Sequence, residues 1–89
     1  MNKILICSEN EDSREALKLI LGDYRELILT DSIEQAKEIV KRTEIEIFFT
    51  DKDKISEVNQ FLTNTSIKTI AILRPIKKEE ILKYIMQES

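Results

Sequence analysis

Acidic and hydroxyl side chains follow the predicted β-strands at the points where the strands end. They are Ser8 and Glu9 after the run 3–7, Asp31 after 26–30, and Asp51 after 45–50; the cation Arg74 follows 67–73. Clustered carboxylate oxygens suit hard cations such as Mg²⁺ or Ca²⁺, and a cation between them relieves their mutual repulsion. Turns are also rich in Asp and Ser for conformational reasons. The pattern alone therefore leaves a metal site and ordinary turn chemistry both open.

Other site chemistries are disfavoured by residue type. The chain contains no histidine, which excludes the common catalytic triads and the usual zinc sites. Cys7 ends the first strand, as the nucleophilic cysteine does in phosphocysteine carriers and small phosphatases, but those proteins hold a phosphate dianion with backbone amides and an arginine. The loop after Cys7 is acidic and lacks glycine, and Arg14 lies one position late for Cys-x5-Arg. Cys7 is therefore predicted to be a buried core residue, and the chain is predicted not to be an enzyme.

Composition predicts one domain over residues 1–89 that binds neither nucleic acid nor membrane. The 89 residues suffice for a single core, and the net charge of −3 disfavours phosphate-backbone contacts. No apolar run is long enough to span a bilayer, and the start, Met1-Asn2-Lys3, lacks the apolar region of a secretory signal. A single cysteine cannot form an internal disulfide, so a reducing, cytoplasmic location is expected.

Strand-like and helix-like segments alternate along the chain. Helices are expected over 12–21, from the Ser32–Gln35 capping box through Val40, over 55–62, and over 78–87. Gly22 is expected to end the first helix, the polar group 63–66 the third, and Pro75 the pairing of the last strand. A βαβαβαβα order predicts an α/β fold with a parallel sheet and helices on both faces.

Three segments, in the same order, resemble parts of a response-regulator receiver domain. Residues 3–11 resemble its first strand and acidic pair, 46–51 resemble the third strand with its terminal phosphoacceptor, and 74–82 resemble the Lys-Pro-aromatic segment before the last helix. The resemblance covers most of the chain. It implies a flavodoxin-like open sheet with strand order 2-1-3-4, shortened from five strands to four.

The resemblance also implies roles for individual residues. Asp51 would be the phosphoacceptor, and Arg74 would contact the phosphoryl group in place of a lysine. Mg²⁺ would be held by Glu9, Asp51 and the backbone carbonyl of Asp53. A histidine kinase or a small phosphodonor would then supply the phosphoryl group.

The sequence also departs from the receiver pattern. Ser8 replaces the first acid of the pair and brings no charge to a metal, and Arg74 is a planar donor that is not equivalent to lysine. The Ser or Thr that senses the phosphate has no counterpart, since Thr69 and Ser66 are not placed for that role. A degenerate receiver acting through protein contacts is therefore expected, with a working Mg²⁺-dependent phosphoacceptor as the alternative. The predicted contact surface, for a homodimer or another protein, is the strand edge 67–73 with its adjacent helices.

Overall fold

A computed structural model describes residues 3–63 and 65–86. The strands are β1 (Lys3–Cys7), β2 (Glu26–Thr30), β3 (Ile45–Asp51) and β4 (Lys68–Ile72). The helices are α1 (Glu11–Leu21), α2 (Ile33–Arg42), α3 (Ile55–Phe61) and α4 (Lys78–Met86), with a 3₁₀ turn at Lys52–Lys54. Three predictions fall outside the described residues. They concern the start at Met1-Asn2, which was expected to lack a secretory signal, the turn residue Asn64 and the end of the last helix at Gln87.

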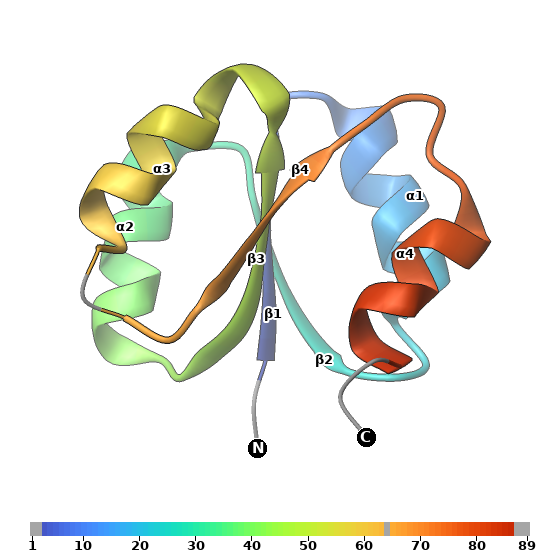
Figure 1. The fold of residues 1–89 in the computed structure, drawn as a ribbon, viewed down its shortest axis with the longest axis horizontal. Helices are drawn as coiled ribbons and strands as arrows, with labels where there is room; N and C mark the ends of the chain where they lie inside the picture. The colour runs from blue at the N-terminus through green and yellow to red at the C-terminus, as the bar shows by residue number, and fades with distance from the viewer. Residues whose placement is uncertain (1–2, 64, 87–89) are drawn as a thin grey trace.

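All neighbouring strands of the sheet pair in parallel, and their order is β2-β1-β3-β4. Helices α2 and α3 cover one face, and α1 and α4 cover the other (Figure 1). This arrangement confirms the predicted α/β class, the strand order and the flavodoxin-like open sheet. No helix in the described part of the chain is long and apolar enough to cross a membrane.

The core consists of two apolar layers, one on each face of the sheet. Strand β1 supplies both layers, since Ile4 and Ile6 face α1 and α4 whereas Leu5 and Cys7 face α2 and α3. Phe48 and Phe49, both fully buried, lie on opposite faces for the same reason. The ring of Phe48 packs edge-on against Phe61 of α3, with 5.9 Å between the ring centroids. The ring of Phe49 packs in the same way against Tyr84 of α4, with a centroid distance of 6.2 Å.

Side-chain caps fix where two helices begin. Asn10 Oδ1 accepts a hydrogen bond from the Ser13 N–H at 2.8 Å, so α1 begins at Glu11, one residue earlier than predicted. Ser32 Oγ accepts from the Gln35 N–H at 3.3 Å, as expected for the first half of a capping box. The second half does not form, because Gln35 Oε1 accepts from Thr30 Oγ1 at 2.7 Å instead.

The strand ends differ slightly from the predicted boundaries. Asp51 pairs with Ile72, which extends β3 by one residue beyond Thr50. Strand β4 is shorter than the predicted range 67–73, because the ladder with β3 begins at Lys68 and ends at Ile72. Asp51 is therefore held in the ladder itself, next to the end of β4.

Thr50, the residue before Asp51, has an unpartnered hydroxyl in the sheet interior. Its side chain is fully buried, and its backbone pairs in register with Cys7 of β1 and Ala71 of β4. Thr50 Oγ1 has no hydrogen-bond partner among the described residues. A buried hydroxyl without a partner lowers the stability of a fold, by about 1–3 kcal/mol.

Candidate functional site

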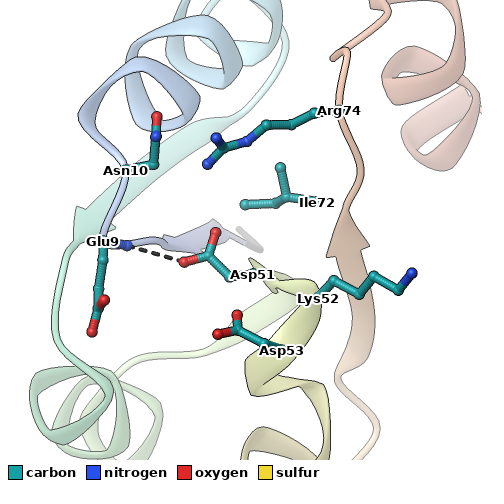
Figure 2. A pocket seen from close by; sticks show the side chains of 7 residues that line it. All are labelled: Glu9, Asn10, Asp51, Lys52, Asp53, Ile72 and Arg74. Atoms are coloured by element: carbon teal, nitrogen blue, oxygen red, sulfur yellow. Dashed lines mark hydrogen bonds between the residues drawn. The ribbon is translucent and has the colours of Figure 1, made fainter.

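An open cleft of about 710 Å³ lies beyond the carboxyl ends of β1, β3 and β4. Its lining residues are Glu9, Asn10, Asp51, Lys52, Asp53, Ile72 and Arg74 (Figure 2). Because the strands are parallel, the loops that leave their carboxyl ends all meet at this edge of the sheet, where ligands of open α/β sheets bind. Three carboxylates and two cations therefore share one cleft.

Both carboxylate oxygens of Asp51 accept hydrogen bonds from the loop between β1 and α1. Ser8 Oγ donates to Asp51 Oδ1 at 2.7 Å, and the Glu9 N–H donates to Oδ2 at 3.1 Å. Ser8 is only 1% exposed, and its Oγ also accepts from the Asn10 N–H at 3.1 Å. Arg14 Nη1 donates to the Ser8 carbonyl at 2.7 Å. The Asp51 side chain thus ties the end of β3 to the β1–α1 loop.

The charged side chains of the cleft point in different directions. Arg74 extends its guanidinium over the cleft toward Asn10, whereas Lys52 points out of it (Figure 2). The Glu9 carboxylate turns away from Asp51, so Glu9 contacts the Asp51 carboxylate through its backbone N–H and not through its side chain (Figure 2). Arg74 is therefore the cation that a group bound above Asp51 would meet.

The donor set limits what cation chemistry the cleft supports. Within the described ranges, no group of three or more Cys, Asp or Glu side chains is arranged to hold a metal ion. The predicted ligands Glu9, Asp51 and Asp53 do line the same cleft. Proteins usually bind Mg²⁺ through one or two carboxylates together with phosphate oxygens and water. Because the described residues offer no such group of three side chains, a cation held here would need oxygen ligands from outside the chain.

The structure brings together four of the residues singled out from the sequence. Glu9, Asp51, Asp53 and Arg74 all line the cleft, whereas Asp31 does not. Asp31 follows β2, which is separated from β3 by β1. The distance across two strands explains why Asp31 does not join the other acids.

Asn10 was missed as a residue of the site in the sequence analysis, and the role of Ser8 was not predicted. Asn10 lines the cleft and caps α1, and its position before Glu11-Asp12-Ser13 is a recognisable capping signal. Ser8 was interpreted only as the loss of an acid, but its hydroxyl binds Asp51 directly. No sequence pattern indicates that hydrogen bond, because the partners are 43 residues apart.

Cys7 is buried at 3% exposure, as predicted. Burial raises the pKa of its thiol to about 11, and the negative charges of Asp51, Asp31, Glu9 and Glu57 act in the same direction. The thiol is therefore protonated at neutral pH and is a poor nucleophile.

Stability is expected to fall as the pH rises from about 9 to about 11, because the unfolded chain loses the Cys7 proton first. The pKa of the folded state lies above that of the unfolded state, so this contribution is complete below pH 9.0 and is lost toward pH 11. Urea denaturation of the wild type and of Cys7→Ala separates the contribution of the Cys7 proton from the titration of lysine and tyrosine, which both proteins share. The stability difference between the two proteins should shrink by about 1–3 kcal/mol between pH 8 and 11. A constant difference would contradict the raised pKa.

Fold and site together define an open parallel α/β sheet with an acidic cleft at its strand ends. Comparison with known proteins found no matching family model and no significant match to a curated protein. The receiver resemblance thus rests on the residues and their arrangement, and what it implies for function is a proposal.

Proposed function

We propose that the chain is a receiver-like signalling module that acts through protein contacts, is degenerate in phosphotransfer and is not an enzyme. The observation that carries this proposal is the hydrogen bond of 2.7 Å from Ser8 Oγ to Asp51 Oδ1. In the receiver pattern the position of Ser8 holds a metal-binding acid. Here an uncharged hydroxyl occupies that position and already engages the oxygen that a metal or phosphoryl group would need.

The contact surface of the proposed module is the β4 edge with its adjacent helices. Strand β4 lies at one end of the sheet, and Ile72 pairs with Asp51 in the ladder. Leu73, directly after the strand, is 55% exposed, and Arg74 of the cleft follows it. A conformational change at Asp51 in the cleft would therefore reach the β4 edge through the backbone pair of Asp51 and Ile72. The single cysteine of the chain, a free thiol, is compatible with a reducing compartment and supports the proposal that the module works in the cytoplasm.

Affinity capture with matched variants tests the β4 assignment. Thr69→Lys adds a charge to the edge strand β4, where lysine commonly blocks strand pairing. The wild type and the control Leu19→Lys, at an exposed position of α1 away from β4, are expected to retain the same protein partner, which Thr69→Lys should lose. Capture that Thr69→Lys leaves unchanged would exclude the β4 edge.

A second candidate function is Mg²⁺-dependent phosphoryl acceptance by Asp51, favoured by the guanidinium of Arg74 above the carboxylate (Figure 2). An Asp51 oxygen would attack the phosphorus of acetyl phosphate, acetate would leave, and an acyl phosphate would remain on Asp51. A histidine kinase would be the corresponding protein donor.

Intact-protein mass spectrometry with acetyl phosphate and Mg²⁺ distinguishes the two candidates. A degenerate module is expected to gain no phosphoryl group. A phosphoryl adduct that disappears in Asp51→Asn and persists in Asp53→Asn would instead establish the phosphoacceptor, because Asp53 is proposed to act only through its backbone carbonyl. Amide NMR shifts at Glu9 and Asp51 during an Mg²⁺ titration give an independent reading of the same question.

A further inference from the structure

The two edge strands of the sheet differ in how much apolar surface they leave exposed. Strand β2 forms the edge opposite β4, and among residues 3–63 and 65–86 it pairs only with β1. Its three central aliphatic residues, 27–29, are all partly exposed, whereas Ile70 and Ile72 of β4 are only 6% and 5% exposed. Strand β2 thus combines an unpaired backbone edge with aliphatic side chains on both faces, a combination that favours pairing with another strand.

We infer that β2 pairs antiparallel with β2 of a second copy of the chain, centred on Ile28. This inference is independent of the proposed function of the cleft. A two-fold axis at Ile28 sets Leu27 opposite Leu29 of the other copy, and the reverse, on the α1 and α4 face. Four leucines would then form one cluster, and the two Ile28 side chains would meet on the opposite face.

The charges that flank β2 complement one another in this register. Arg25, directly before the strand, falls opposite Asp31, directly after it, so the pairing forms this contact twice. Asp31 is exposed, and the Arg25 side chain is 32% exposed with its Nε 3.4 Å from Glu46 Oε1. The five donors of a guanidinium allow Arg25 to serve Glu46 and a second carboxylate together. Glu26 meets Thr30, so no like charges face each other.

The neighbouring symmetric registers lack this complementarity. Shifting the centre to Leu27 sets Arg25 opposite Leu29 and Glu26 opposite Ile28. Shifting it to Leu29 sets Leu27 opposite Asp31. Each shift places a charge against an aliphatic side chain, which disfavours the pairing. The sequence around β2 therefore selects the Ile28 register.

Strand β4 is less suited to pairing with its own copy. Centring an antiparallel pair on Ile70 sets Lys68 opposite Ile72, and centring it on Ala71 sets Lys68 opposite Arg74. The first places a charge on an aliphatic residue, and the second opposes two cations. The chain therefore self-associates through β2, and the β4 edge remains free to bind a different protein.

Charge reversal across the pair tests the proposed register. By light scattering during size exclusion, the purified chain is expected to form a concentration-dependent dimer. Asp31→Lys faces Arg25 with a like charge and should raise the dissociation constant at least about tenfold, and adding Arg25→Glu should restore it to within about threefold. Glu57→Lys on α3 makes the same charge change away from β2 and should have no effect. Circular dichroism confirms that each variant is folded.

Three outcomes would overturn the inference. One is a chain that stays monomeric at every concentration. Another is a dimer that Asp31→Lys leaves unchanged, and the third is a dimer that Thr69→Lys dissociates, which would place the contact on β4. Capture of a protein partner through β4 neither requires nor excludes the β2 dimer, so the failure of either proposal is distinguishable from failure of the other.

An engineered disulfide gives a test that does not depend on charge. Opposed residues of antiparallel strands have Cα atoms about 4.5–5.5 Å apart, within the span of a disulfide. In a Cys7→Ala background, Ile28→Cys should therefore form a covalent dimer under oxidation. Glu26→Cys is the control, because each Glu26 faces Thr30 and lies far from its own copy. Equal cross-linking of the two variants would indicate random collision and contradict the register.

Discussion

Replacement of Leu17 by alanine is expected to destabilise the protein by about 2–5 kcal/mol, whereas the same change at Leu19 should cost less than about 0.5 kcal/mol. Both leucines lie on α1, two residues apart, but Leu17 is fully buried and Leu19 is 82% exposed. Leu17→Ala removes side-chain volume from the layer beneath α1 and α4 and leaves a cavity, whereas Leu19→Ala alters only solvated surface.

Urea denaturation followed by circular dichroism measures both effects. A domain of this size has a total stability on the order of 5–13 kcal/mol, so Leu17→Ala should remove a large part of it. Leu19→Ala is the matched control, because helix, residue type and substitution are the same. Equal losses at the two positions would mean that α1 does not pack in the orientation described.

The second large effect is expected for Ser8→Asp, which should make stability depend on divalent cations. Ser8 is buried, and its Oγ lies 2.7 Å from Asp51 Oδ1, so the substitution brings two carboxylates into contact. Without a cation their repulsion and the loss of the hydrogen bond should cost about 2–4 kcal/mol. A cation between the two carboxylates removes the repulsion, so Mg²⁺ should restore most of the loss.

Thermal melts in EDTA and at millimolar Mg²⁺ show this dependence directly. Ser8→Asn serves as the control, because it is similar in size but carries no charge. Its melting temperature should be the same in both conditions, as should that of the wild type. If the melting temperature of Ser8→Asp is the same with and without Mg²⁺, this end of the sheet cannot hold a cation even when acidic residues occupy both positions 8 and 9.

The fold was predictable because each of its elements has a strong local signal. Apolar runs bounded by polar turns predicted β1 and β2 with the observed limits, and the Ile33–Val40 stripe predicted α2. The strand ends that differ, at Asp51 and Ile72, are set by the ladder between β3 and β4. A local sequence pattern does not show which distant segments pair, so the strand ends that depend on this pairing were not predicted.

The site was predictable in its composition but not in its geometry. Parallel topology alone places Glu9, Asp51 and Arg74 at one edge of the sheet, and all three line the cleft. Which way a side chain turns depends on its local hydrogen bonds. The Glu9 carboxylate faces away while the Glu9 N–H and the Ser8 hydroxyl hold Asp51, and residue types and spacing do not contain that information.

The Thr50 hydroxyl places an energetic cost in the middle of the sheet. A valine at position 50 would have nearly the same shape as the threonine, and it would bury no unpartnered polar atom in the strand between Cys7 and Ala71. Natural sequences commonly give up stability close to the residues they use. The Thr50 hydroxyl lies immediately before Asp51 in β3, a central strand of the sheet, so the chain accepts an energetic cost next to the residue whose hydrogen bond to Ser8 supports the proposed function.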